Sequence, residues 1–587
     1  MAQSVLSFVS DDWAYWIDRM AGLFTATEIV LAGVMIALAF TLPQTGGRLF
    51  AAIERHGSKL LLEPVSQLLA IAVIAVLARA LFLPWLGPPV PVSHDEHSLM
   101  LQAQTFLEGR LANPTPPFWK HFEAIHINVV PSYASMYFPG RGLPLAFGLL
   151  VGEHAWIGVW LSFALMCVAS VWMLQQWVAP PFAFLGGLLV VIHLGVFSYW
   201  INSYWGGAFT ACGGMLVLGA VPQMLRRPEW RTGALMGVGA LILLITRPVE
   251  GALLCLPVGV MILVKLLRTR ASSFARDIAR IAIPVAAFAA LGGTLMIAYN
   301  KAATGDPFVT PYELNREAYA TAPAFLVSPP PPGEKRGPEY FRPFYDWEHI
   351  PYERRTIPGK LLLSVLAKFY DSWNFYVGII LTPAFLAGLW ASRREPILPV
   401  TLAFFYSGFV FETWNFPHYT APIFPVVLVI TMMGFEALRS WRPRDKGSGL
   451  FLTRAMPVAL LFTLLVPTSA AIAGWPPLVS NQHNKPCCAL QQSTVRTEIT
   501  SKLKAIPGRD LILVSSANHP VHLAILYNEP DIARSDIVWA NRLGEEEDAP
   551  LISHFADRIV WDLEWSEDEK GYRLKRRASS GPTGSSK

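Results

Sequence analysis

The sequence predicts an all-α polytopic membrane protein with about twelve transmembrane helices, followed by a small α/β domain. Of its 587 residues, 53% are hydrophobic and only 15% are charged, and the mean hydropathy is +0.39. An ordinary soluble protein is less apolar and carries about 25% charged residues. The apolar residues are gathered in continuous runs, as helices that cross lipid require, whereas the last part of the chain is polar.

Each predicted span is an apolar run, and a run of roughly 17 to 25 residues can cross the hydrocarbon core of a bilayer. The runs do not alternate between polar and apolar residues, and lipid forbids an open sheet edge, so a membrane sheet is excluded. They lie near 25–42, 65–86, 154–177, 181–198, 207–225, 232–247, 249–268, 281–299, 373–391, 397–412, 418–438 and 455–474.

The orientation of the spans follows from the connecting segments, because Lys and Arg are retained on the cytoplasmic side. Basic residues cluster in every second gap, except the very short gap after the third span. Two outer loops, 88–142 and 300–358, and everything after about residue 474 therefore face outward. The net charge of +5 is mostly a signal of this topology, and nothing in it points to nucleic acid. Asp11, Asp12 and Asp18 precede the first run, so we expect an uncleaved first helix rather than a signal peptide.

The chain divides into four predicted parts. Residues 1–61 hold an extra helix and a cytoplasmic connection, 62–475 form the main transmembrane domain, 476–575 form the outer α/β domain, and 576–587 form a disordered tail. Within the α/β domain we expect a polar helix near 491–505 and apolar strands at 511–514, 537–539 and 559–561. In the second outer loop, the proline run 329–332 favours extended segments, typical of a lid or a linker.

The first outer loop opens with His94, Asp95, Glu96 and His97, and helical spacing predicts a short helix over 96–107. Asp95 then lies near the N-terminus of this helix, where capping is the ordinary role of an aspartate. The side chains of adjacent carboxylates diverge, so this pair does not form a glycosidase-type site. Direct displacement fits better, with one carboxylate as general base and the other binding a metal or orienting the acceptor.

The same loop carries further nitrogen and oxygen donors that could hold a divalent metal: Lys120, His121, Glu123 and His126, together with His94 and His97. Their spacing matches no closed zinc motif. Two interpretations stay open, a metal site with His97, His121 and His126 as candidate ligands, and ordinary hydrogen bonding by mostly neutral histidines.

Two arginines, Arg79 and Arg247, stand within or at the ends of apolar spans, where a charge needs a partner. In the segment 247–251, Pro and Gly break the helix where Arg247 and Glu250 are placed together. The pair is either a structural contact or a cation site for a lipid phosphate.

Aromatic residues gather at the predicted outer boundary. Tyr199-Trp200 and Tyr204-Trp205 are typical of an aromatic belt, and the alternative is a platform for stacking a sugar. His418 and Tyr419 begin the eleventh span and are expected at cavity depth.

Several of these segments, in this order, resemble the bacterial C-type (GT-C) membrane glycosyltransferases, the polyprenol-dependent superfamily that includes protein O-mannosyltransferases and aminoarabinose transferases. The resemblance covers about residues 60 to 440. The matching segments are Asp95-Glu96 after a span, Tyr137-Phe138-Pro139-Gly140, Tyr299-Asn300, Thr304-Gly305-Asp306-Pro307, Pro311-Tyr312 and His418-Tyr419. The chain departs from the aminoarabinose transferases in having Phe138-Pro139-Gly140 where they have Lys-Pro-Pro, which leaves the donor sugar open.

The resemblance implies inverting transfer of a hexose or pentose from a polyprenyl-phosphate donor to a glycan, lipid or protein acceptor of the cell envelope. It implies a multi-pass protein of the bacterial inner membrane, with the active site and the C-terminal domain facing the periplasm. The resemblance also implies that Asp95 is the catalytic acidic residue, and Glu96 matches the second member of the Asp-Glu motif. Arg247, Arg79 and Tyr312 would hold the donor phosphate. Contacts with acceptor or sugar are expected from His94, Glu123, Tyr137, Arg141, Glu250, His418 and Tyr419.

Two alternatives remain. A transporter or flippase of a lipid-linked sugar would show repeated halves and ionisable groups at the bilayer midplane, and neither is evident in the sequence. An inactive scaffold would only present the C-terminal domain. No cofactor is certain, and a divalent metal stays open.

Overall fold

The computed structural model describes residues 22–60, 63–269, 272–443, 446–473, 485–487, 494–515, 524–566 and 571–577. They form two compact units, which we describe one at a time. The helical unit comprises 1–89, 159–293 and 362–491, and the mixed unit comprises 90–158, 294–361 and 492–587. The acidic N-terminal residues before position 22, and the expected tail from position 578 on, lie outside the described residues.

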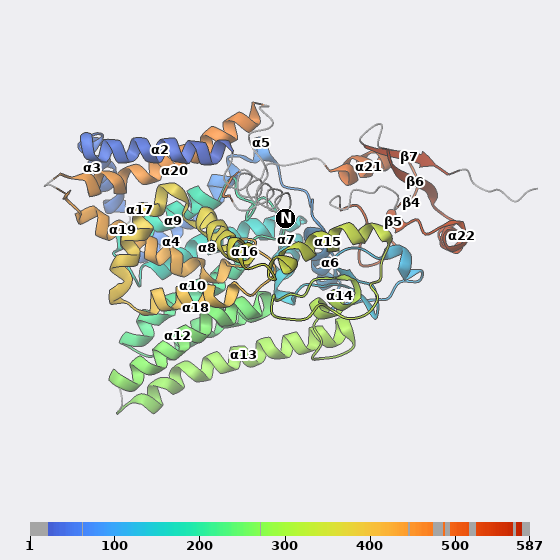
Figure 1. Ribbon diagram of the computed structural model, residues 1–587, viewed down its shortest axis with the longest axis horizontal. Coiled ribbons are helices and arrows are strands. Elements are labelled where there is room, and N and C mark those ends of the chain that lie inside the picture. Colours follow the sequence, from blue (N-terminus) through green and yellow to red (C-terminus); the bar gives the residue numbers. More distant parts are fainter. Residues whose placement is uncertain are drawn as a thin grey trace, which may run out of the picture. The chain divides into compact units, whose positions relative to one another are not determined.

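The helical unit is built from apolar helices (Figure 1). Helices α2 and α20 lie side by side. Helix α17 packs closely on α19, and the two backbones approach so closely at Gly388 and Gly434 that a Cβ would not fit at either position. The helices are α2 (Leu23–Thr41), α3 (Gly47–Leu60), α4 (Pro64–Ala80), α5 (Leu83–Leu86), α9 (Pro180–Leu194), α10 (Ala208–Arg226), α11 (Trp230–Thr246), α12 (Pro248–Thr269), α17 (Gly378–Ala391), η4 (Ser392–Arg394), α18 (Ile397–Phe409), η5 (Ala421–Ile423), α19 (Phe424–Ser440) and α20 (Ser448–Ile472), with α8 (Ala155–Leu174), α13 (Phe274–Thr304) and α16 (Pro358–Tyr376), which have residues in both units.

All twelve predicted runs coincide with helices, so the prediction of a multi-span helical membrane protein is confirmed. In the described part of the chain, eight helices are long and apolar enough to cross a membrane, or nine if one bent pair is a single span. Three further runs form α9, α11 and α18, of 15, 17 and 13 residues, which are shorter than the other spans. Exposed apolar side chains such as Leu291, Leu295 and Ile297 of α13 suit contact with lipid.

The predicted span at 373–391 does not form one continuous helix, because the chain bends by 99° between α16 and α17. Gly378 stands at the bend with φ +61°, a conformation that favours glycine. The carboxylate of Glu28, a fully buried residue of α2, accepts a hydrogen bond of 3.2 Å from the backbone N–H of Ile379. The carboxyl oxygen at this place satisfies an N–H that the first turn of α17 leaves without a helical partner.

Replacing Glu28 by leucine is expected to destabilise the helical unit by about 1–3 kcal/mol, because a buried N–H loses its acceptor. Glu28→Gln keeps an oxygen acceptor at the same place and is the matched control. Thermal unfolding of the purified protein in detergent measures the difference. Equal midpoints for the leucine and glutamine variants would show that the contact does not hold the bend.

The mixed unit contains short helices and two sheets. A small antiparallel sheet has the strand order β1-β3-β2, and a four-stranded sheet has the order β5-β4-β6-β7, in which β4 pairs parallel with β5 and β6 while β7 is antiparallel to β6. The elements are α6 (His94–Leu107), β1 (Asn113–Pro114), η1 (Trp119–Phe122), β2 (Ile127–Asn128), β3 (Ser132–Ser135), η2 (Pro139–Arg141), α7 (Leu143–Gly152), α14 (Pro311–Tyr319), η3 (Glu339–Phe341), α15 (Arg342–Arg354), α21 (Val495–Lys504), β4 (Asp510–Val514), β5 (Ile537–Asn541), α22 (Glu545–His554), β6 (Ile559–Ser566) and β7 (Gly571–Arg576).

The C-terminal α/β fold is confirmed, since α21, β4, β5 and β6 stand where the sequence predicts them. Helix α22 and strand β7 are additions. Arg576 belongs to β7 and Arg577 pairs with Glu545, so the first two residues of the expected disordered tail are ordered. One core is shared between this fold and the first loop: Leu101, Phe122, Ile127 and Tyr133 cluster with Leu511, Leu513, Val538 and Leu551.

Candidate active site

Asp95 is the second residue of α6, and Ser93 is the cap of this helix. The Ser93 side chain accepts a hydrogen bond from the Glu96 backbone N–H, and the Glu96 carboxylate accepts from the backbone N–H groups of Val92 (2.8 Å) and Ser93 (3.0 Å). Glu96 is fully buried in this capping box. The capping role that the sequence left open for Asp95 is therefore filled by its neighbours, and the geometry gives Glu96 a structural task.

The Asp95 carboxylate lies among polar groups of the first loop. The Tyr137 hydroxyl donates a hydrogen bond to Asp95 Oδ1, and His126 Nδ1 lies 3.6 Å from Asp95 Oδ2. The hydroxyl oxygen of Tyr137 also lies 3.2 Å from His126 Nδ1. The guanidinium of Arg141 lies 5.2 Å from the centroid of the Tyr137 ring. The Asp95 side chain keeps 23% of its surface exposed. The predicted residues Asp95, Tyr137, Arg141 and His126 are thus brought together around one partly accessible carboxylate.

The surroundings of Asp95 favour its ionised form. Burial on its own would raise the pKa of Asp95, but His126, the hydrogen bond from Tyr137 and the positive charge of Arg141 together lower this pKa below its ordinary value of 3.8. Asp95 is therefore a carboxylate at neutral pH, and a carboxylate can accept a proton.

Helix α15 of the second outer loop adds groups that the sequence did not single out. Glu348 lies 4.0 Å from His126 Nε2 and is paired with Arg316 of α14 at 2.5 Å. The ring of Phe344 stands edge-on to the rings of His94 and His126, with centroids 5.4 Å apart in each case. The loop expected to be a lid or a linker therefore forms part of the wall around the site.

His126 adopts a backbone conformation that non-glycine residues rarely take, with φ +66°. Its carbonyl accepts hydrogen bonds from the Ser98 hydroxyl (2.7 Å) and from the Met136 backbone N–H (3.2 Å). These two bonds hold the imidazole at Asp95 in spite of the strain. Backbone strain that the surroundings stabilise in this way is concentrated at functional sites.

His94 and His97 both face Tyr527 of the C-terminal segment. The Tyr527 hydroxyl oxygen lies 2.6 Å from His94 Nδ1, and the Tyr527 ring stacks on the His97 ring at 4.4 Å. Burial, with the nearby charges of Arg496 and His94, lowers the pKa of His97 well below its ordinary value of 6.5, so His97 is neutral at pH 7.

His121 and Glu123 have other partners. His121 Nε2 lies 3.2 Å from a carboxylate oxygen of Asp548 in α22, and both side chains are buried. The Tyr319 hydroxyl donates a 3.0 Å hydrogen bond to Glu123, and burial raises the pKa of Glu123 above its ordinary value. Among the described residues, no group of three or more His, Cys, Asp or Glu side chains is arranged to hold a metal ion. The three candidate metal ligands, His97, His121 and His126, therefore each have a different partner.

The contact between His121 and Asp548 is expected to hold the first loop to α22. Burial would raise the pKa of Asp548, but hydrogen bonds from His121 and the Leu543 backbone lower it, so its stabilising effect is present above pH 3.8 and is lost as the pH falls below that value. Asp548→Asn should cost about 1–3 kcal/mol at pH 7. The control is Asp557→Asn, because the pair of Asp557 with Arg509 is exposed and weak. Hydrogen exchange of the α22 backbone amides in the full-length protein measures the effect of both substitutions. Equal protection of α22 in the two variants would contradict the prediction.

In the helical unit, the predicted pair of Arg247 and Glu250 is formed. Arg247 Nη1 lies 2.9 Å from Glu250, and the Arg247 guanidinium lies 3.7 Å from the ring centroid of Tyr419. Glu412 and Lys368 are buried in the same unit, and Lys368 donates hydrogen bonds to the carbonyl oxygens of residues 409 and 410. Three of the predicted residues, Arg247, Glu250 and Tyr419, thus lie together.

The other two proposed phosphate ligands have separate surroundings. Arg79 is 1% exposed and donates hydrogen bonds to Asn202 (3.1 Å) and to the carbonyl oxygen of Gly87 (2.6 Å). Tyr312 belongs to α14 in the mixed unit, beside Arg316. These two hydrogen bonds hold the turn at Gly87.

The expected aromatic belt is not found, because Tyr199, Trp200, Tyr204 and Trp205 are all buried, at 0–7% exposure. Their rings pack on one another and on rings from distant segments, such as Phe375, Phe416 and His418. The hydroxyl oxygen of Tyr199 lies 3.2 Å from His418 Nδ1 and accepts a hydrogen bond from the backbone N–H of His418. His418 is therefore part of a buried aromatic cluster, which also rules out an exposed stacking platform.

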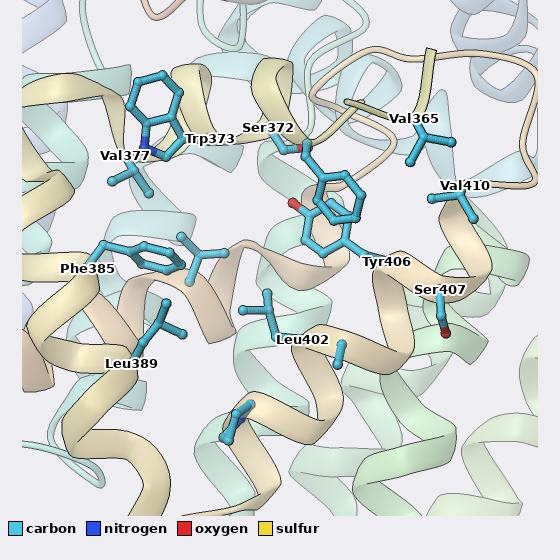
Figure 2. A pocket seen from close by; sticks show the side chains of 14 residues that line it. Val365, Ser372, Trp373, Val377, Phe385, Leu389, Leu402, Tyr406, Ser407 and Val410 are labelled. Carbon is cyan, nitrogen blue, oxygen red and sulfur yellow. The ribbon is translucent and has the colours of Figure 1, made fainter. Parts of the chain in front are cut away.

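A cavity of about 690 Å³ lies among α16, α17 and α18 of the helical unit. Its walls are mostly apolar, and Figure 2 shows Phe385 and Leu389 of α17 facing the same space as Leu402 of α18. The break at Gly378 lies next to Val377, another of the lining residues. By its size and chemistry the cavity suits a hydrocarbon chain.

No protein-family model matches the chain, and no curated protein matches it. Among solved structures, ArnT from Cupriavidus metallidurans in the apo state is similar, with a TM-score of 0.47 and 11% identity over 85% of this chain and 93% of that chain. ArnT bound to undecaprenyl phosphate has a TM-score of 0.43 and 12% identity, over 88% of this chain and 99% of that chain. The archaeal oligosaccharyltransferase AglB from Archaeoglobus fulgidus, in complex with an inhibitory peptide and a dolichol-phosphate, has a TM-score of 0.44 and 10% identity, over 89% of this chain and 75% of that chain. The chain is thus structurally similar to ArnT and to AglB.

Proposed function

We propose that this protein is an inverting glycosyltransferase that moves a sugar from a polyprenyl-phosphate donor to an acceptor in the cell envelope. The observation that carries the proposal is the ionised, partly exposed carboxylate of Asp95, held by Tyr137 and His126 in a multi-pass membrane protein. The sequence resemblance to the C-type glycosyltransferases supports the same reaction. The distribution of basic residues predicts that the reaction takes place on the outer face of the membrane, and by the sequence resemblance this face is the periplasmic side of the inner membrane.

The chemistry requires one base. Asp95 removes the proton of an acceptor hydroxyl as the acceptor oxygen attacks the anomeric carbon of the sugar. The bond between this carbon and the phosphate oxygen breaks, and its electron pair leaves with the phosphate. Because the lowered pKa makes Asp95 a weak base, the proton moves late, after the new bond has begun to form. A single displacement of this kind inverts the configuration of the sugar.

The donor phosphate needs positive charge, since a leaving phosphate takes no proton. We propose Arg247 for this role, because its planar guanidinium is held between Glu250 and Tyr419. The prenyl chain is a hydrocarbon, and we propose the apolar cavity among α16, α17 and α18 as its place. Arg79 and Tyr312 remain proposals as further ligands of the phosphate, and His94, Glu123 and Arg141 as contacts of sugar or acceptor.

The rival proposal, a flippase, predicts a different product. The purified protein is reconstituted into vesicles with radiolabelled polyprenyl-phosphate sugars on one side and a panel of acceptors. We expect label in an acceptor and one free polyprenyl phosphate for each sugar transferred. Movement of intact donor to the other leaflet, without free polyprenyl phosphate, would replace the enzyme by a flippase.

A further inference from the structure

The C-terminal segment of the chain contributes a side chain to the surroundings of Asp95. Tyr527 is 5% exposed, and its hydroxyl oxygen lies 2.6 Å from Nδ1 of His94, which is 433 positions away in the sequence. His94 directly precedes Asp95 in α6. The imidazole of His94 also makes ring contacts with His126 and Phe344, so it belongs to the group of side chains that surrounds the carboxylate.

The direction of these hydrogen bonds fixes the form of His94. A tyrosine hydroxyl has one proton, and that of Tyr527 is donated to the carbonyl oxygen of Ile125 at 3.0 Å. The oxygen of Tyr527 therefore accepts from His94, which must carry its proton on Nδ1. In a neutral imidazole the other nitrogen, Nε2, then holds the lone pair and can only accept a hydrogen bond. Burial raises the pKa of Tyr527 well above its ordinary value, so its hydroxyl stays protonated.

Tyr527 is held in place independently of His94. Its ring is nearly parallel to the ring of His97, at 10° and 4.4 Å. Its carbonyl oxygen accepts a 2.8 Å hydrogen bond from Arg496, whose guanidinium lies 4.5 Å from the ring centroid of Trp539. The bond from Arg496 comes from α21, so the C-terminal fold holds the backbone of the tyrosine, while His97 of α6 packs on its ring.

We propose that Tyr527 is a positioning residue of the Asp95 site, that it holds His94 with its proton on Nδ1, and that the C-terminal fold is in this way a part of the enzyme. Held in this way, the imidazole of His94 stays against His126 and Phe344 beside the Asp95 carboxylate. The role in transfer rests on the proposed function, whereas the form of His94 does not.

The first test needs no substrate. Nitrogen NMR of the full-length protein with ¹⁵N-labelled histidine, in detergent at neutral pH, reports which ring nitrogen carries the proton, and His94→Gln identifies the signal. We expect the Nδ1–H pattern for His94 in the natural protein and its loss in Tyr527→Phe, which retains the ring and its stacking on His97. An Nε2–H pattern in the natural protein, or an unchanged signal in the variant, would overturn the proposal.

The second test separates positioning from packing. Tyr527→Phe should lower kcat for transfer by about tenfold, the scale of one lost hydrogen bond, with an unchanged KM for the donor. Tyr340→Phe is the matched control, because the buried hydroxyl of Tyr340 donates a 3.1 Å hydrogen bond to Asn541 of the same C-terminal fold. Equal losses of kcat in the two variants would reduce Tyr527 to a packing residue. Absence of transfer by the natural protein would count against the proposed function, while the NMR result would still decide the form of His94.

Discussion

Asp95→Asn is expected to lower the rate of sugar transfer by about 10²- to 10⁴-fold, the contribution of one general base, while the protein stays folded and inserted. The amide oxygen of asparagine can still accept the hydrogen bond from Tyr137, so the surroundings persist, but the amide cannot take the acceptor proton. The initial rate of polyprenyl phosphate release, at equal amounts of inserted protein, measures the loss.

The neighbouring Glu96 provides the control for Asp95. Glu96→Gln keeps the capping box, because the side-chain oxygen of glutamine can also accept hydrogen bonds from the backbone N–H groups of Val92 and Ser93. Transfer should remain within a few-fold of the natural rate, since an oxygen acceptor is all that the box requires. If Asp95→Asn retained turnover, or if both amide variants lost it equally, the assignment of the base would be wrong.

Arg247→Lys is expected to raise the KM for the donor by about tenfold or more. Lysine keeps the positive charge next to Glu250 but lacks the planar fork that binds two phosphate oxygens and that lies on the ring of Tyr419. The thermal midpoint should change little, because the ion pair survives. Steady-state kinetics with varied donor in lipid measures the effect.

The control for Arg247 is Glu250→Gln, which weakens the ion pair and leaves the guanidinium in place. If the pair binds phosphate, the donor KM in this variant should stay the same or fall. If the pair is only structural, Glu250→Gln should lower the thermal midpoint and Arg247→Lys should leave the donor KM unchanged, which would remove Arg247 from the proposed mechanism.

The spans were predictable because lipid demands long apolar runs, and each run marks its own helix without reference to the rest of the chain. The bend at Gly378 was not. The N–H of Ile379 at the bend bonds Glu28, which is 351 positions away, and a single glutamate in an apolar run gives no sign of its partner. The buried state of Tyr199 and Trp205 was missed for the same reason, since their partner rings come from other helices.

At the candidate site, too, features set by a local sequence pattern were predictable and features set by distant contacts were not. Helical spacing was enough to predict α6, and Ser93 with Glu96 three residues later is a capping-box signature that could have given Glu96 its structural role from the sequence. Glu348 and Tyr527 carried no such signal. They are brought to His126 and His94 by the packing of the second loop and of the C-terminal fold, and no local pattern encodes that packing.

The proposed mechanism is a single displacement at the sugar with Asp95 as the base, and the anomeric configuration of the transferred sugar tests it most directly. NMR of the product formed from a donor of known configuration reads it. A single displacement gives the product the configuration opposite to that of the donor. Retention of the donor configuration would require a covalent sugar intermediate or a second displacement, and would contradict the mechanism.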